Sequence, residues 1–136
     1  CLIAMMSAFE FGYRYVIPSV KRRLVENLIE MGLTRREAAK KTGLSTSAVS
    51  RYLSLERGSY INVAAHSDVD RAISELAASI RDNRIDFSGV QIQIHRIAIY
   101  ALSRKYMCED HAKINLEINP KLCSICPTLF SSPARL

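Results

Sequence analysis

The chain has no stretch that approaches the roughly 20 uninterrupted apolar residues of a membrane-spanning helix. Its opening segment, CLIAMMSAF, lacks the basic flank of a secretory signal. The sequence also lacks a phosphate-binding loop, a nucleophile–base pair and a carboxylate dyad, which are the usual groups of catalytic sites. We therefore expect a soluble cytoplasmic protein that is not an enzyme and has no membrane partner.

Acidic residues are the minority, with 13 Asp and Glu against 19 Lys and Arg, which gives a net charge of +6. The segment from Arg14 to Arg57 holds ten basic and four acidic residues, so it contains the whole excess. Such a basic segment is often only a solvated helix face, but it also suits a surface that neutralises nucleic-acid phosphates.

Residues 34–53 read TRREAAKKTGLSTSAVSRYL, which predicts two short helices joined by a tight turn. Thr34 is a good N-cap for the first helix, and Glu37, three residues later, completes a capping box. Gly43 can adopt the left-handed conformation that ends a helix. The first short helix should therefore run from about residue 35 to residue 42.

Ser45 offers the N-cap of the second short helix. Val49, Tyr52 and Leu53 recur at helical spacing and should form its buried face. The side chains expected on the exposed face are short or basic, and all can form hydrogen bonds: Thr46, Ser47, Ser50, Arg51 and Ser54.

The order of Ala39, Gly43 and Val49, followed by Tyr52-Leu53, resembles the helix-turn-helix of Cro/CI-type (XRE-type) transcription regulators. In that motif the second helix lies in the major groove, where its first residues contact base edges. The resemblance implies a sequence-specific regulator that binds double-stranded DNA. An antiparallel helical hairpin with a glycine turn and no role in DNA binding is the alternative.

The resemblance makes the start of the second helix the base-reading surface, with the residues Ser45, Thr46, Ser47, Ser50 and Arg51. The basic residues around it are expected to hold phosphates: Arg35, Arg36, Lys40, Lys41 and Arg57. The same basic face would also suit an adaptor protein that contacts RNA, the ribosome or a polymerase.

Apolar spacing predicts three further helices. The first spans about 19–31, with Pro18 in its first turn, and the second spans about 67–80. The third runs from about residue 88 or 90 to residue 107 and has apolar residues on more than one face. Because such a helix needs more than one neighbour, it suggests a homodimer, with a monomeric core as the alternative. Residues 59–65 should form a connector with some β character.

Two short-spaced pairs, Cys108-x2-His111 and Cys123-x2-Cys126, lie near the end of the chain. Two such pairs separated by a loop can hold a zinc ion in tetrahedral geometry. An iron–sulfur cluster on the three cysteines, with Cys1 or His111 as the fourth ligand, is the alternative. A Cys123–Cys126 disulfide and free thiols also remain open.

The combination of these features is similar to a group of small archaeal Cro/CI-type predicted regulators. In that group a Cys-Glu pair often lies shortly before the Tyr-Val-Ile-Pro-like start of the first helix. Here the corresponding pair is Phe9-Glu10, which leaves Cys1 as the only N-terminal substitute for that cysteine.

The predicted fold is all-α: a helix-turn-helix domain, two long helices and a short metal-binding knuckle. The predicted divisions are an N-terminal tail (1–12), a DNA-binding domain (13–58), a packing and dimerisation region (59–107), a Cys/His segment (108–130) and a tail (131–136).

Overall fold

The computed structural model describes residues 6–130, and every regular element among them is helical. The elements are α1 (Ala8–Phe11), the π-helical turn η2 (Gly12–Val16), α2 (Ile17–Glu30), α3 (Arg35–Thr42), α4 (Thr46–Leu53), the 3-10 turn η3 (Val63–Ala65), α5 (Ser67–Arg81), α6 (Phe87–Ser103), α7 (Cys108–Ile114) and α8 (Ile125–Phe130). This confirms the all-α prediction for the described residues. None of these helices is both long enough and apolar enough to cross a membrane.

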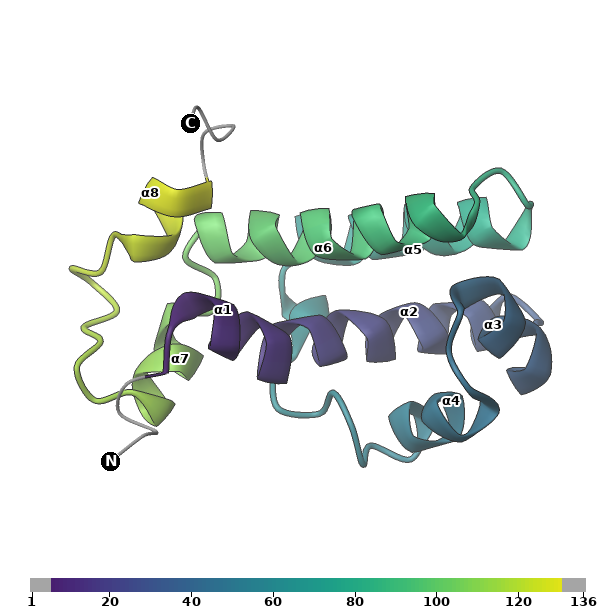
Figure 1. The fold of residues 1–136 in the computed structure, drawn as a ribbon, viewed down its shortest axis with the longest axis horizontal. Helices are drawn as coiled ribbons and strands as arrows, with labels where there is room; N and C mark the ends of the chain where they lie inside the picture. The colour runs from purple at the N-terminus through teal and green to yellow at the C-terminus, as the bar shows by residue number, and fades with distance from the viewer. Residues whose placement is uncertain (1–5, 131–136) are drawn as a thin grey trace.

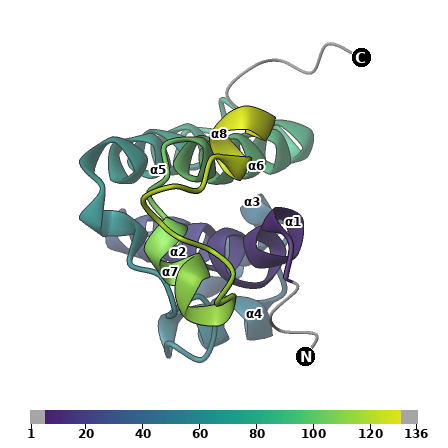
Figure 2. The same ribbon diagram turned by 90° about the vertical axis from the view of Figure 1, so that its left-hand side faces the viewer.

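The helices form two layers (Figure 1). The hairpin of α5 and α6 is one layer, and the rod formed by α1, η2 and α2 lies across from it, as the end-on view also shows (Figure 2). At one end of the molecule α3 and α4 pack on α2, while α7 and α8 lie at the other end, with α8 against α6.

The rod is longer than the helix that the sequence predicted, because that helix was expected to start near Pro18. Residues 1–12 were expected to form a tail. Ser7 caps the rod by accepting a hydrogen bond from the backbone N–H of Glu10 (3.2 Å). Proline inside a helix removes a backbone hydrogen bond and crowds the preceding turn. The wider π turn before Pro18 accommodates its ring. Residues 8–11, which the prediction placed in the tail, are therefore helical, and Phe11 is fully buried in the core.

The main core lies between the rod and the α5–α6 hairpin. Each of its central side chains is at most 6% exposed: Val20, Leu24 and Leu28 from α2, Val69, Ile73, Leu76 and Ile80 from α5, and Val90, Ile94 and Ile97 from α6. Burying one such side chain stabilises the fold by roughly 1.5–3 kcal/mol. The apolar stripes predicted for 19–31 and 67–80 are therefore confirmed.

Two other predicted features are wrong. Residues 59–65 contain the turn η3 and no strand, and Val63 anchors this connector because it is fully buried. Helix α6 ends at Ser103 instead of residue 107, since Lys105 adopts a left-handed conformation with φ of 63°.

Candidate nucleic-acid interface

Helix α3 has the ends that the sequence predicts. Thr34 Oγ1 accepts a hydrogen bond from the N–H of Glu37 (3.1 Å), and Glu37 Oε1 accepts one from the N–H of Thr34 (3.4 Å). This reciprocal pair is the predicted capping box. Gly43 ends α3 with φ of 76°. A residue with a Cβ pays about 1–2 kcal/mol in that conformation.

Helix α4 follows after a turn at residues 43–45. Ser45 Oγ accepts a hydrogen bond from the N–H of Ala48 (3.0 Å), which confirms Ser45 as the predicted N-cap. The hydroxyl oxygen of Ser45 is therefore already engaged at the helix end. Its first role is to fix the direction in which α4 begins.

The helices α2, α3 and α4 share a small apolar cluster, separate from the main core, that contains Val25, Ala39, Ala48, Val49 and Tyr52. Val49 is fully buried and Tyr52 is 5% exposed, as the helical spacing predicts. The alanine side chains let the three helices approach closely. This cluster holds α3 and α4 on α2 as one unit and fixes which face of α4 points outward.

The outward face of α4 presents unengaged polar groups. Thr46, Ser47 and Arg51 are exposed, and their side chains form no hydrogen bond or ion pair with any other described residue. Ser50 is half-buried, and its hydroxyl accepts a hydrogen bond from the guanidinium of Arg35 (3.1 Å). Of the predicted base-reading residues, Thr46, Ser47 and Arg51 are thus both exposed and free of side-chain partners among the described residues.

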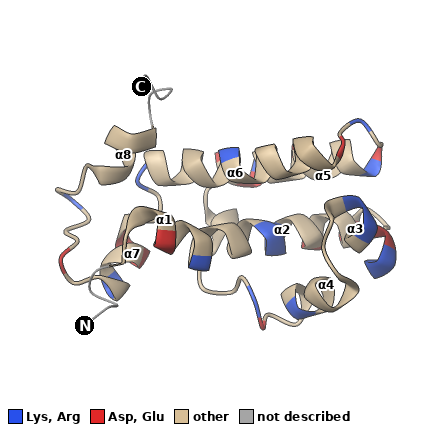
Figure 3. Cartoon of the chain, viewed as in Figure 1, with Lys and Arg blue, Asp and Glu red and all other residues tan. Residues whose placement is uncertain are grey.

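Helix α3, which packs beside α4, carries several basic residues (Figure 3). Arg36 and Lys40 are exposed, whereas Lys41 is half-buried. The ammonium of Lys41 donates to the carbonyl of Arg81 (3.3 Å) and to Oδ1 of Asn83 (2.9 Å). These bonds tie α3 to the end of α5, so we remove Lys41 from the predicted phosphate contacts.

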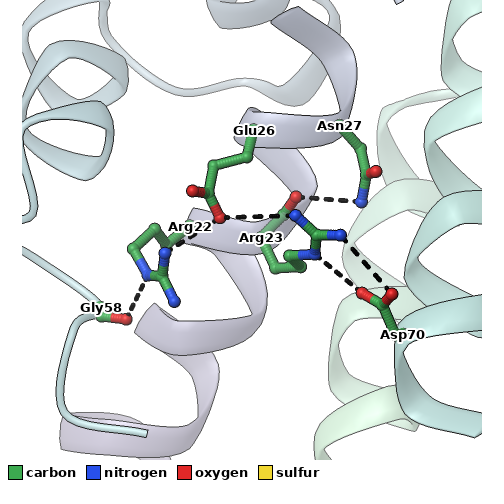
Figure 4. Close-up of polar contacts among 6 residues, drawn as sticks. All are labelled: Arg22, Arg23, Glu26, Asn27, Gly58 and Asp70. Atoms are coloured by element: carbon green, nitrogen blue, oxygen red, sulfur yellow. Dashed lines mark hydrogen bonds and ion pairs between the residues drawn. The ribbon is translucent and has the colours of Figure 1, made fainter. Parts of the chain in front are cut away.

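Two arginines of the basic segment also act inside the fold (Figure 4). Arg23 pairs with Asp70 of α5 through Nε (2.7 Å) and Nη2 (3.5 Å), and this hydrogen bonding raises the pKa of Arg23. Arg22 donates from Nε to the carbonyl of Gly58 (2.7 Å) and pairs with Glu26 (2.9 Å). The positive charge free for a partner is therefore smaller than the sequence count suggests.

Family models, curated proteins and solved structures give no match to this chain. The residues and their geometry therefore provide the functional argument.

The three cysteines predicted as metal ligands belong to α7, to the segment before α8 and to α8. Cys108 opens α7, Cys123 precedes α8, and Cys126 lies within α8. Burial raises the pKa of the Cys126 thiol to about 11, with smaller contributions from Cys108 and Cys123. Burial also raises the pKa of Cys108, and Cys123 adds to that effect.

His111, the fourth predicted ligand, is engaged elsewhere. Its ring stacks on Phe11 with 4.6 Å between the ring centroids, and its Nε2 lies 3.1 Å from the carbonyl oxygen of Met6. Within residues 6–130, no group of three or more His, Cys, Asp or Glu side chains is arranged to hold a metal ion. The predicted set of Cys108, His111, Cys123 and Cys126 therefore does not fit a metal in this arrangement, and Cys1 lies outside the described residues.

Proposed function

We propose that the chain is a sequence-specific transcription regulator that binds double-stranded DNA through α4. The observation behind this proposal is the outward face of α4, where Thr46, Ser47 and Arg51 have unengaged donors and acceptors. Such groups recognise base edges in the major groove, which is wide enough to admit an α-helix. This placement agrees with the resemblance to Cro/CI-type regulators.

In this proposal the basic residues of α3 hold the DNA backbone. Arg36 and Lys40 contact phosphates directly, and Arg35 does so while its guanidinium also orients Ser50. Arg57, in the loop after α4, contacts a phosphate at the other end of the same helix. These contacts position α4 and contribute affinity that falls with salt, whereas Arg51 discriminates between bases.

We also propose that two copies bind together as a homodimer. Helix α6 leaves Ile92 50% exposed and Ile99 40% exposed, on the same side of the helix and outside the core. If two copies pair through Ile92 and Ile99, these exposed apolar side chains are covered by the α6 helix of the partner. Two α4 helices would then enter successive major grooves, roughly 34 Å apart.

Selection from a random pool of DNA duplexes by the full-length chain tests the proposal. We expect enrichment of a motif with two related half-sites spaced by about one helical turn. A pool that shows no enriched motif after repeated rounds would overturn sequence-specific binding. Tighter binding to structured RNA than to any duplex would favour the adaptor function instead.

A metal bound by the cysteines of residues 108–126 stays a prediction. Elemental analysis of anaerobically purified protein tests it. About one zinc per chain without visible colour would show a zinc site. Iron and sulfide with a brown colour would show a cluster. A metal-free protein would leave free thiols or a disulfide between Cys123 and Cys126.

A further inference from the structure

A groove of about 640 Å³ lies between the start of the rod, the end of α4 and the loop that follows α4. Tyr13, Arg14 and Lys21 line it from the rod, while Tyr52 and Arg57 line it from α4 and its loop. None of the functions proposed above needs a cavity at this place. Its volume lies in the range of small-molecule sites, which is roughly 300–1,000 Å³.

The walls of the groove are fixed by the fold. The carbonyl of Gly58 accepts a hydrogen bond from Arg22 Nε (2.7 Å), which fastens the loop to α2. Gly58 has φ of 72°, and a Cβ there would overlap the carbonyl oxygen of Pro18. On the opposite wall, Tyr13 and Arg14 belong to the π turn η2. Such turns are rare and occur frequently at functional sites.

The charge in the groove is mainly positive. Arg14, Lys21 and Arg57 form no ion pair with another residue in the described part of the chain. Glu56 is the only acidic residue in the lining, which also contains His95. Cations that the fold leaves unpaired around a cavity suit a ligand with at least two negative charges, such as a phosphate monoester.

Aromatic rings are the second feature of the groove. Tyr13 is 76% exposed and Tyr60 is 43% exposed, and Tyr60 lies 4.6 Å from Tyr15 between ring centroids. Exposed ring faces that line a cavity offer stacking surfaces to a planar ligand, and base–tyrosine stacking is sequence-tolerant.

Tyr52 adds a hydrogen-bond donor to the lining of the groove. It is 5% exposed and lines the groove, and its hydroxyl has no hydrogen-bond partner among residues 6–130. Burial raises the pKa of Tyr52, so the phenol stays neutral and can donate a hydrogen bond. Among residues 6–130 no buried side-chain nitrogen or oxygen lacks a hydrogen-bond partner, so the hydroxyl of Tyr52 reaches the surface of the groove, where it can donate to a ligand oxygen.

We propose that this groove binds a nucleotide, with the base stacked on Tyr13 or Tyr60 and the phosphate held by Arg14 and Lys21. A free mononucleotide fits better than a strand of nucleic acid because the lining forms one cavity instead of a track for a backbone. Tyr52 follows Arg51 in α4, and it is buried whereas Arg51 is exposed. Because Tyr52 lines the groove, a bound nucleotide would contact α4 and change the orientation of this helix. This coupling rests on the proposed DNA binding.

Isothermal titration calorimetry of the full-length chain, without DNA, tests the binding itself. The probes are AMP, GMP, CMP and UMP, with adenosine and inorganic phosphate titrated separately. We expect saturable binding of at least one nucleoside monophosphate, and at least tenfold weaker binding of adenosine and of phosphate. Absence of binding by all four nucleotides, or equal binding by phosphate alone, would overturn the proposal.

The variants Tyr13→Ala and Arg14→Ala locate the site. Both side chains are exposed, so these changes leave the core intact. Each variant should lower the affinity for the nucleotide at least fivefold. The control Arg71→Ala changes an exposed arginine of α5 outside the groove and should leave this affinity unchanged. Equal effects of all three variants would overturn the assignment. Binding of a short single-stranded oligonucleotide without any mononucleotide binding would make the groove a nucleic-acid surface instead.

Discussion

Gly58 shows how single residues shape the surface beside α4. Both Gly58 (φ 72°) and Gly32 (φ 97°) have left-handed backbones, but only at Gly58 would a Cβ meet other atoms closely. Gly32→Ala should therefore cost roughly 1–2 kcal/mol of unfolding free energy from backbone strain alone. Gly58→Ala should cost roughly 2–5 kcal/mol, because overpacking against Pro18 and Arg22 adds to the strain. Urea unfolding of the two variants measures the difference, and equal losses would contradict the tight approach at Gly58.

Asp68 is the residue whose charge should matter most for stability at low pH. Its Oδ2 accepts hydrogen bonds from the hydroxyls of Tyr100 (2.6 Å) and Tyr106 (2.7 Å), which lower the pKa of Asp68 to about 2. Arg104 lies over the ring of Tyr100, at 5.5 Å from its centroid.

Because the folded pKa of Asp68 lies below its ordinary value of 3.8, the contribution to stability is present above about pH 4. It should disappear as the pH falls toward 2. Thermal unfolding of Asp68→Asn and wild type should therefore differ at neutral pH and converge in acid. The control Glu75→Gln, on the same helix, should follow wild type throughout. A constant difference across the pH range would show that Asp68 acts through packing alone.

Sequence reasoning succeeded for residues that act on their immediate neighbours. Thr34 and Ser45 were predictable caps because a cap bonds a backbone N–H three residues away. Arg22, Arg23 and Lys41 could not be assigned in this way. They bind partners 36, 47 and 42 positions away, and only the packing of α2, α3 and α5 brings those partners close.

At the scale of the element, α4 depends on its N-cap. Ser45→Ala should lower the unfolding free energy by about 1 kcal/mol, because the N–H of Ala48 loses its acceptor. Ser45→Asn should restore most of the loss, since asparagine caps equally well. Ser47→Ala, on the exposed face, should change the unfolding free energy by less than about 0.5 kcal/mol. Urea denaturation measures all three, and unchanged stability of Ser45→Ala would contradict the cap.

The rod is the element that sequence reasoning misjudged. A proline normally marks a helix start, so the aromatic residues before Pro18 had no assigned secondary structure. The π turn continues the helix through this point and places Tyr13 and Arg14 beside the end of α4. The Tyr-Arg-Tyr order at 13–15 was a visible signal, but its position depends on a turn that no spacing rule predicts. The groove was missed for this reason.

At the scale of the whole molecule, the homodimer depends on the exposed stripe of α6. Wild type should sediment as a dimer, and the double variant Ile92→Glu/Ile99→Glu should sediment as a monomer, because paired carboxylates oppose burial of the stripe. Both residues lie outside the core, so the double variant should still unfold cooperatively as a folded monomer. The control Leu116→Glu, at a position 87% exposed, should remain dimeric. Sedimentation equilibrium decides, and a monomeric wild type would contradict the pairing.

The cysteine-rich end shows the limit of spacing arguments. His111, which its Cys-x2-His spacing predicted as a metal ligand, instead contributes to the core by stacking on Phe11. The burial of His111 depends on α1, which the sequence prediction assigned to a tail. The error at the start of the rod therefore also affected the expected ligand set.

The measurement that tests the central claim most directly is equilibrium binding of the full-length chain to a selected duplex and to a shuffled duplex. Arg51→Ala should weaken the binding free energy for the selected duplex by roughly 1–3 kcal/mol and for the shuffled duplex by little, because Arg51 contacts a base. Arg36→Ala should lose similar affinity on both duplexes, because it contacts a phosphate. Equal binding of both duplexes by the wild-type chain, or equal losses on both for Arg51→Ala, would contradict base recognition by α4.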